Sequence, residues 1–281
     1  MHFLKKILDF YIFSNIHVAL AGFCLTKITL FEFGIEDSLV PVFVLLSIII
    51  SYNLIRFFEI KANSLNWFKN WFLTHKKALF SLSVLSTFSL GYIIFFSSFN
   101  LSSLVVLFPF AFMTLFYVVP LFKIGKIEVS FRNFPFVKIF SIAISWAGIT
   151  VFFPIYEAGF EITSSVYIEF IQRILFLIAI TIPFDIRDVN IDPKSLKTLP
   201  QVLGVSRAKF VSYVMLLLFV FLEFYRKDYS NLDFYIVIVI AIISSLFLGF
   251  SSPGRTRYYT GFWVESIPII WFGFIILFLN K

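Results

Sequence analysis

Charged side chains are scarce in this sequence, and cysteine is nearly missing. Asp, Glu, Lys and Arg make up 14% of the 281 residues, and Cys24 is the single cysteine. Soluble domains carry about a quarter charged residues, so this chain has too few to cover the surface of a globular protein in water. One cysteine also excludes an internal disulfide framework. The solvent around most of the chain is therefore expected to be lipid.

Apolar residues dominate instead. They account for 60% of the sequence, 42 of them are Phe, and the mean hydropathy is +0.95. They form blocks of roughly 20 residues, the length that a helix needs to cross a bilayer core. We predict an all-α polytopic membrane bundle of about nine transmembrane helices, forming a single membrane domain over residues 1–281. The spans are expected near 10–30, 39–59, 78–98, 101–120, 134–154, 165–184, 206–225, 232–251 and 262–280.

The positive charges predict the orientation of the bundle. Most of the 23 Lys and Arg residues lie on the N-terminus or in and beside four connections, 60–77, 121–133, 185–205 and 252–261. Loops rich in Lys and Arg stay in the cytoplasm. We therefore predict a protein of the bacterial inner membrane, with these loops and the N-terminus on the cytoplasmic side. The N-terminal segment lacks a small-residue cleavage site, so we interpret it as the start of the first span. Because the basic residues are dispersed, nucleic acid is not an expected partner, and no obligate protein partner is evident.

Charged residues toward the outer side of the membrane are expected to be structural or solvated. Arg173 lies inside the sixth span, and Glu169 precedes it by four residues. Residues four apart meet on a helix face, so we predict a structural ion pair. Glu32 belongs to a set of acidic residues in the opposite connections, which we interpret as solvated loop charges.

Three aspartates follow the sixth span: Asp185, Asp188 and Asp192. Their spacing places all three carboxylates on one face of a helix, where they repel one another and oppose the helix macrodipole. Mg²⁺ prefers oxygen ligands and is often shared between carboxylates and substrate phosphates. We predict a Mg²⁺ site in which Asp188 and Asp192 are the main ligands and catalytic residues, with Asp185 as a third ligand.

A solvated acidic loop is the alternative explanation of the three aspartates. In that case Arg187, Lys194 and Lys197 would neutralise them. The spacing alone favours neither explanation, so further residues have to decide.

The residues around the aspartates resemble a known motif. Residues 185–204 read Asp-Ile-Arg-Asp-Val-Asn-Ile-Asp-Pro-Lys-Ser-Leu-Lys-Thr-Leu-Pro-Gln-Val-Leu-Gly. This is similar to the second aspartate motif of the UbiA-type prenyltransferase superfamily, an Asp-rich stretch with a Thr-Leu-Pro-x-x-Leu-Gly-like tail. Residues 116–123, Phe-Tyr-Val-Val-Pro-Leu-Phe-Lys, are similar to the Tyr-x-x-Pro segment with a following Lys after that family's fourth span. Nine spans with long inner loops also suit the family.

The resemblance implies an intramembrane transferase with Mg²⁺ as its cofactor. Such proteins move a prenyl group from a polyprenyl diphosphate to a lipophilic acceptor, often an aromatic ring in a quinone pathway. Here the resemblance implies diphosphate contacts from Lys123 and Asn53, with Arg132 and Lys138 as weaker candidates. Arg187 and Arg56 are further candidates for diphosphate contacts, because they are cations beside the two motif segments.

Polar side chains in or near the spans add pocket candidates, namely Tyr117, His17 and Glu265. Each has a plainer alternative. Tyr117 fits an aromatic belt at the membrane interface, and His17 fits a hydrogen bond between helices. Glu265 could instead pair with Arg257.

The chain departs from the family at the first aspartate motif, Asn-Asp-x-x-Asp-x-x-x-Asp. Residues 52–61 keep Asn53 but carry Leu54, Phe57 and Lys61 at the Asp positions. Either a single Mg²⁺ binds through the second motif, or Arg56 and Lys61 supply positive charge where the family has a metal. The plainer alternative is that both are ordinary cytoplasmic-side charges.

Three functions stay open from the sequence. The first is a prenyltransferase, and the second is an inactive relative that binds an isoprenoid or assists a partner enzyme. The third is a transporter, although no matching pair of Gly- or Pro-interrupted spans supports it.

Overall fold

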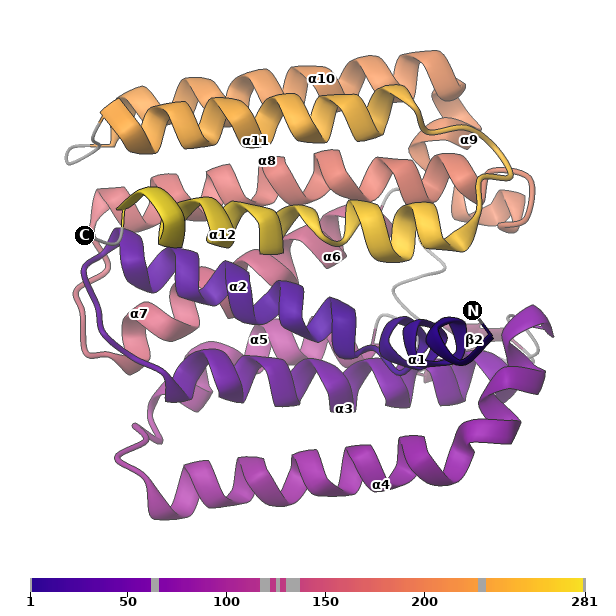
Figure 1. Ribbon diagram of the computed structural model, residues 1–281, viewed down its shortest axis with the longest axis horizontal. Helices are drawn as coiled ribbons and strands as arrows, with labels where there is room; N and C mark the ends of the chain where they lie inside the picture. The colour runs from indigo at the N-terminus through magenta and orange to yellow at the C-terminus, as the bar shows by residue number, and fades with distance from the viewer. Residues whose placement is uncertain are drawn as a thin grey trace.

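The computed structural model describes residues 2–61, 66–116, 122–124, 127–129, 137–226 and 231–279. Its long helices lie side by side, most of them along one axis (Figure 1). A two-stranded antiparallel sheet, β1 (Phe122–Ile124) and β2 (Ile127–Val129), lies in the connection expected to be a loop. The rest of the described chain is helical or forms turns and short connections.

The helices account for most of the described chain. In chain order they are α1 (His2–Phe13), α2 (Ile16–Glu32), α3 (Leu39–Lys61), α4 (Asn66–Phe96), α5 (Ser103–Phe116), α6 (Val137–Ala147), η2 (Gly148–Phe152), α7 (Phe153–Glu157), α8 (Ser164–Arg187), η3 (Lys194–Leu196), α9 (Leu199–Leu203), α10 (Val205–Leu222), η4 (Glu223–Tyr225), α11 (Asn231–Gly249), η5 (Tyr259–Val264) and α12 (Ile267–Leu279).

Within these residues, seven helical segments are long and apolar enough to cross a membrane: Leu39–Ile60, Phe68–Phe96, Lys138–Glu157, Ser164–Arg187, Val205–Tyr225, Asn231–Gly249 and Tyr259–Phe278. The pair α1 and α2, bent by 56° at its break, makes an eighth if it is one span. The expected fourth span is represented by a shorter apolar helix, Ser103–Leu115, and residues 117–121 lie outside the described part. A polytopic helical bundle is therefore confirmed. The described residues give seven candidate spans, or up to eight, and the count of about nine stays a prediction.

The outside of the bundle is apolar, as lipid requires. On α4 the side chains of Phe80, Phe88 and Phe95 are largely exposed. Exposed apolar surface on this scale is rare on soluble monomers, whereas in a bilayer such side chains face hydrocarbon. The helix backbone satisfies its own polar groups, which is the condition for crossing that hydrocarbon.

Helix α8 lies at the centre of the fold and packs against α6 and α10. Phe176 of α8, Phe219 of α10 and Trp271 of α12 form an aromatic cluster, with Trp271 edge-on to both phenyl rings at centroid distances of 5.2 and 5.5 Å. All three side chains are buried. This cluster holds the middle of α8 against α10 and α12.

A proline inside α8 removes one backbone hydrogen bond, and a side chain of a neighbouring helix replaces it. Pro183 has no N–H, so the carbonyl of Ala179 one turn earlier has no helix donor. Ser212 of α10 donates its hydroxyl to that carbonyl at 3.0 Å. A neighbouring hydroxyl is how transmembrane helices tolerate proline, and here the repair also joins α10 to α8.

The fifth span contains a wider turn, the π-helix η2. Pro154 follows it and cannot donate to the carbonyl of Thr150, which favours an irregular turn at this position. Gly148 opens η2 where Phe110 of α5 packs closely. A Cβ at position 148 would lie 2.3 Å from the Phe110 ring, so the contact requires glycine.

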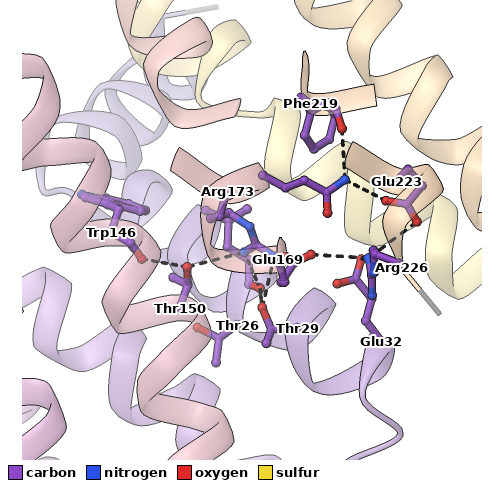
Figure 2. A network of polar contacts seen from close by, with 12 residues as sticks. Thr26, Thr29, Glu32, Trp146, Thr150, Glu169, Arg173, Phe219, Glu223 and Arg226 are labelled. Atoms are coloured by element: carbon purple, nitrogen blue, oxygen red, sulfur yellow. Dashed lines mark hydrogen bonds and ion pairs between the residues drawn. The ribbon is translucent and has the colours of Figure 1, made fainter. Parts of the chain in front are cut away.

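A buried network of charges lies at the distal end of the bundle, the end at which α8 begins (Figure 2). Arg173 of α8 is 0% exposed. It donates to Glu169, to the carbonyl of Leu25 at 2.9 Å and to the hydroxyl of Thr29 at 3.1 Å. The predicted pair of Glu169 and Arg173 is confirmed. The hydrogen bonds from Arg173 to Leu25 and Thr29 also join α8 to α2.

Arg226, after η4, extends this network. Its Nη1 lies 3.2 Å from Glu32, 3.4 Å from Glu169 and 3.6 Å from Glu223. Gln172 donates to Glu223 at 2.8 Å. We call Glu32, Glu169, Gln172, Arg173, Glu223 and Arg226 the distal network. The interpretation of Glu32 as a solvated loop charge was wrong, because its side chain is only 11% exposed and paired with Arg226.

Gly148→Ala is expected to lower the stability of the bundle, because the new methyl group would overlap the Phe110 ring. Overpacking of this kind costs about 1–3 kcal/mol. Gly91→Ala in α4 is the matched control, since a Cβ there meets nothing within 4 Å, and it should stabilise the helix by about 0.5–1 kcal/mol. Denaturant unfolding in detergent measures both. A Gly148→Ala protein as stable as Gly91→Ala would contradict the close packing of α5 against η2.

Arg173→Leu is expected to destabilise the protein by about 3–5 kcal/mol, because it removes one partner of a buried ion pair. Replacing Glu169 by Leu in the same protein should recover part of the loss, since the carboxylate that was left without Arg173 is then gone. The free energy of unfolding of the two proteins measures the coupling. If the single and double variants lose the same stability, Glu169 and Arg173 are not coupled.

Candidate functional site

The three aspartates lie where α8 ends, at what we call the motif end of the bundle. The helix stops at Arg187, and Asp188 is its C-cap. Asp192 lies beyond the helix, in a turn. Its backbone N–H donates to the carbonyl of Asp188 at 2.8 Å. The expectation that one helix face carries all three carboxylates was therefore wrong. Carboxylates at a helix C-terminus oppose its dipole, and Pro193 keeps residue 192 out of helical geometry.

Lys138 of α6 brings two of the aspartates together. Its ammonium nitrogen lies 2.7 Å from Asp185 Oδ1 and 3.0 Å from Asp192 Oδ2. Asp185 is buried, and Asp192 and Lys138 are mostly buried. One cation thus bridges two carboxylates that are seven residues apart in the sequence.

The third aspartate has a different partner. Arg187 donates through Nε to Asp188 Oδ1 at 2.8 Å and through Nη2 to Oδ2. Its Nη1 donates to the hydroxyl of Thr260 in η5. The backbone carbonyl of Arg187 accepts from Gly254 at 3.1 Å. Arg187 therefore joins the end of α8 to the segment between α11 and α12.

The tail of the motif positions the loop that carries Asp192. Gln201 of α9 accepts from the backbone N–H of Thr198 at 3.0 Å and donates to the carbonyl of Asp192 at 2.9 Å. Gly204 joins α9 to α10 with φ of +80°, a region that favours glycine. The Thr-Leu-Pro-x-x-Leu-Gly pattern thus has a local structural use, which is to turn the chain and hold Asp192 against α6.

The carboxylates of Asp185 and Asp192 fit a single Mg²⁺ ion. Each has an oxygen within 3.0 Å of the same ammonium nitrogen, so they flank one point that already accommodates a cation. Mg²⁺ commonly takes one or two carboxylates and completes its shell with water and phosphate oxygens. No group of three His, Cys, Asp or Glu side chains gathers around a point in the described residues, and Asp188 is held by Arg187.

A cavity of about 150 Å³ lies between α3, α5 and α6. Tyr52, Arg56 and Glu59 line it from α3, Thr114 from α5, and Ser141, Ser145 and Trp146 from α6. Ser141 lies one turn after Lys138 and donates to its carbonyl at 3.0 Å. The cavity wall on α6 therefore continues directly into the residue that joins Asp185 to Asp192.

Charged and aromatic side chains both line the cavity. Arg56 Nη1 lies 3.1 Å from Glu59 Oε2, and Arg56 keeps about a third of its side chain exposed (35%). The indole N–H of Trp146 donates to the hydroxyl of Tyr52 at 3.1 Å, and the two rings meet edge-on at 6.2 Å. A polar head group could contact Arg56 and the hydroxyls, while an apolar group could lie against the aromatic rings.

Positive charge gathers at the motif end. Burial and the nearby charge of Arg187 lower the pKa of the Arg257 guanidinium, although Asp188 acts in the opposite direction. Glu265, after η5, lies within electrostatic reach of both Arg56 and Arg187. These arginines come from α3, from the end of α8 and from the chain before η5, and they converge on the site with Lys138.

Two predicted residues serve helix packing in the structure. Asn53 is buried, accepts from Asn15 at 2.8 Å and donates to Ser83 at 3.3 Å. The ring nitrogens of His17 lie 2.9 Å from the Tyr11 hydroxyl and 3.0 Å from the carbonyl of Phe262. The predicted contact of His17 between helices is thereby confirmed.

The structure brings together Asp185, Asp188, Asp192 and Arg187, with Arg56 and Glu265 nearby. Tyr117 and the side chains of Lys123 and Lys61 lie outside the described residues. Comparisons of this chain with models of known protein families, with curated proteins and with solved structures gave no match.

Sequence reasoning missed the pairing of Lys138 with the aspartates and the cavity roles of Tyr52 and Trp146. A signal was present for Lys138, because it is a lysine at the very start of a span on the same predicted side as the aspartates. No sequence signal identified Tyr52 and Trp146, since aromatic residues occur throughout the spans.

Lys138→Gln is expected to destabilise the metal-free protein by about 3–5 kcal/mol, because Asp185 loses its buried partner. Mg²⁺ should then stabilise the variant more than the wild type, since the ammonium no longer competes for the two carboxylates. Thermal unfolding with and without Mg²⁺ measures this. Lys194→Gln, an exposed charge in the same loop, is the control. A Mg²⁺ effect on Lys138→Gln no larger than on the wild type would exclude a metal site between Asp185 and Asp192.

Proposed function

We propose that this protein is a membrane-embedded prenyltransferase, which moves a prenyl group from a polyprenyl diphosphate to a lipophilic acceptor. The main support is the meeting of Asp185 and Asp192 at one cation position, held by Lys138 next to a cavity between α3, α5 and α6. A cation position beside an intramembrane cavity suits a ligand with a charged head and an apolar body. The resemblance of residues 185–204 to an aspartate motif of such enzymes agrees with it.

The diphosphate would lie among the positive charges of the motif end. Arg56 faces the cavity with part of its guanidinium exposed, and a guanidinium can bind phosphate oxygens in pairs. Arg187 reaches the same end of the bundle from α8. Lys123 is a further proposed contact. Fixed cations of this kind would replace the first aspartate motif that the chain lacks.

Asp185 and Asp192 would hold Mg²⁺ together with phosphate oxygens, and Asp188 would orient Arg187. Bound Mg²⁺ would draw charge from the diphosphate and make it a better leaving group. For this the ammonium of Lys138 must leave the carboxylates, which a flexible four-carbon stem allows. It would then be free to contact the diphosphate.

The prenyl group and the acceptor would occupy the apolar part of the cavity. The faces of Tyr52 and Trp146 can stabilise a cationic allyl group through their π electrons, and the surrounding hydrocarbon keeps water from the reacting carbon. The residues of the motif end would face the cytoplasm of a bacterial cell, as the distribution of Lys and Arg predicts. Nine spans in a UbiA-like arrangement belong to the same proposal.

The second candidate is an inactive relative that binds an isoprenoid or assists another enzyme. One observation favours it, namely that each aspartate already has a cationic side chain as partner. In that case the acidic residues would be structural, and a prenyl diphosphate would bind without reaction.

The test is Mg²⁺-dependent binding of farnesyl diphosphate to the purified protein in lipid nanodiscs. Asp185→Asn and Asp192→Asn should each weaken binding tenfold or more, about 1.4 kcal/mol, whereas Glu161→Gln, an exposed carboxylate at the distal end, should not. Chelation of Mg²⁺ should weaken wild-type binding equally. Release of diphosphate on addition of a quinone-precursor acceptor identifies a transferase.

Two other outcomes decide between the alternatives. Binding without diphosphate release supports the inactive relative. Absence of binding, or binding that neither aspartate variant changes, contradicts the proposal and leaves the transporter, for which flux of a labelled isoprenoid into vesicles is the measurement.

A further inference from the structure

The distal network has more acidic than basic groups. Its ionisable members are three carboxylates, Glu32, Glu169 and Glu223, and two guanidiniums, Arg173 and Arg226. If all five were ionised, the network would carry one net negative charge among side chains that are buried or nearly buried. An unbalanced buried charge is costly in a membrane protein, so the network needs one further positive charge.

The carboxylates do not share the two cations equally. Glu169 is the best compensated, because Oε1 accepts from Arg173 and Oε2 lies 3.4 Å from Arg226. Glu223 accepts from the amide of Gln172 at 2.8 Å in addition to its contact with Arg226. Within the described part of the chain, Glu32 pairs with Arg226 through Oε1 alone, and its Oε2 is buried and has no hydrogen-bond partner there.

Further acceptor atoms in the network lack a donor. The side-chain carbonyl oxygen of Gln172 and Oε1 of Glu223 are buried without a hydrogen-bond partner among the described residues, and both residues are almost fully buried, at 2% and 1% exposure. Gln172 belongs to the network through its amide, which donates to Glu223. The described network therefore lacks one positive charge, and buried acceptor atoms without a donor lie on the same residues.

Arg226 does not remove this deficit. Burial alone would lower the pKa of its guanidinium, but the carboxylates of Glu32, Glu169 and Glu223 outweigh that effect and hold the pKa above its ordinary value. Arg226 is thus already fully charged and cannot supply a further positive charge. Arg173 is also already committed, to Glu169, the Leu25 carbonyl and Thr29.

We propose that the distal network is a proton-binding site, in which Glu32 holds one proton on Oε2 at neutral pH. Among the residues that the structure describes, the charged groups that face Glu32 are Arg226 and Arg173 as cations and Glu169 and Glu223 as anions, while Asp233 of α11 acts on Glu223. Protonation of Glu32 leaves two carboxylates for two guanidiniums. The side chain of Glu32 is 11% exposed at the end of α2, so the proton exchanges with the aqueous phase on the distal side.

The site connects three elements of the fold. Glu32 ends α2, Glu169 lies on α8, and Glu223 begins η4 directly after α10. Loss of the proton would place an uncompensated charge where these elements meet. The ionic contacts that join the end of α2 to α8 and η4 therefore depend on the pH at the distal side, independently of any reaction at the motif end.

Infrared difference spectroscopy of the protein in nanodiscs tests this directly. At neutral pH the wild type should show a carboxylic acid C=O band that shifts in D₂O, and Glu32→Gln should lack that band. Glu36→Gln, which removes an exposed carboxylate four residues away, is the matched control and should keep it. Glu32→Gln is expected to fold, because it leaves the network with equal numbers of positive and negative groups.

Thermal unfolding provides a second readout. The folded wild type holds a proton that the unfolded chain releases above the ordinary carboxyl pKa of about 4.3, so its stability relative to Glu32→Gln should fall as the pH rises from mildly acidic to alkaline. The control Glu36→Gln should follow the wild type over the same range.

Three results would overturn the proposal. The first is that the acid band is absent at neutral pH, and the second is that it is the same in Glu32→Gln as in the wild type. The third is a band that appears only when sodium and potassium are removed, because a metal cation would then balance the network in place of the proton.

Discussion

Charge pairing across helices is the interaction on which this bundle depends. Lipid offers no counter-ion and no hydrogen bond, so each charge in the membrane must find its partner within the protein. Helix α8 carries such charges at both ends, Arg173 at the distal end and Asp185 at the motif end, and both reach partners on other helices. The position of α8 between α2, α6 and α10 is therefore fixed by electrostatics as well as by the aromatic cluster at its middle.

The two ends use different cations, and the difference fits their proposed roles. At the distal end, the planar guanidinium of Arg173 is committed to fixed acceptors on two other segments of the chain. At the motif end, the cation between the carboxylates is a lysine, a compact charge on a flexible stem that can move away. A rigid pairing suits a structural junction, whereas a replaceable one suits a site at which a metal and a phosphate bind.

The sequence predicted features that arise from short spacing. Apolar blocks identified the helices, the i, i+4 spacing identified the pair of Glu169 and Arg173, and the dense aspartates identified the motif end. It failed where the partner is remote in the chain. Glu32 was placed in solvent because its partner Arg226 follows almost two hundred residues later, and Lys138, the partner of Asp185, was missed because it lies on another helix. The spacing alone placed Asp192 on the helix face, but Pro193 directly after it pushes that residue out of helical geometry, and α8 ends before it.

The π-helix η2 bears on which changes in chain length the protein tolerates. A π-turn contains one residue more than an α-turn, so a deletion within Gly148–Phe152 would let the span close into a regular helix. The wide turn absorbs the extra residue, so the side chains on either side of it would keep their directions. Phe153 and Ile155, both fully buried, would stay against their neighbours. A single-codon deletion here should thus be tolerated better than one in a regular part of the same span, where every side chain beyond it would rotate by about 100°.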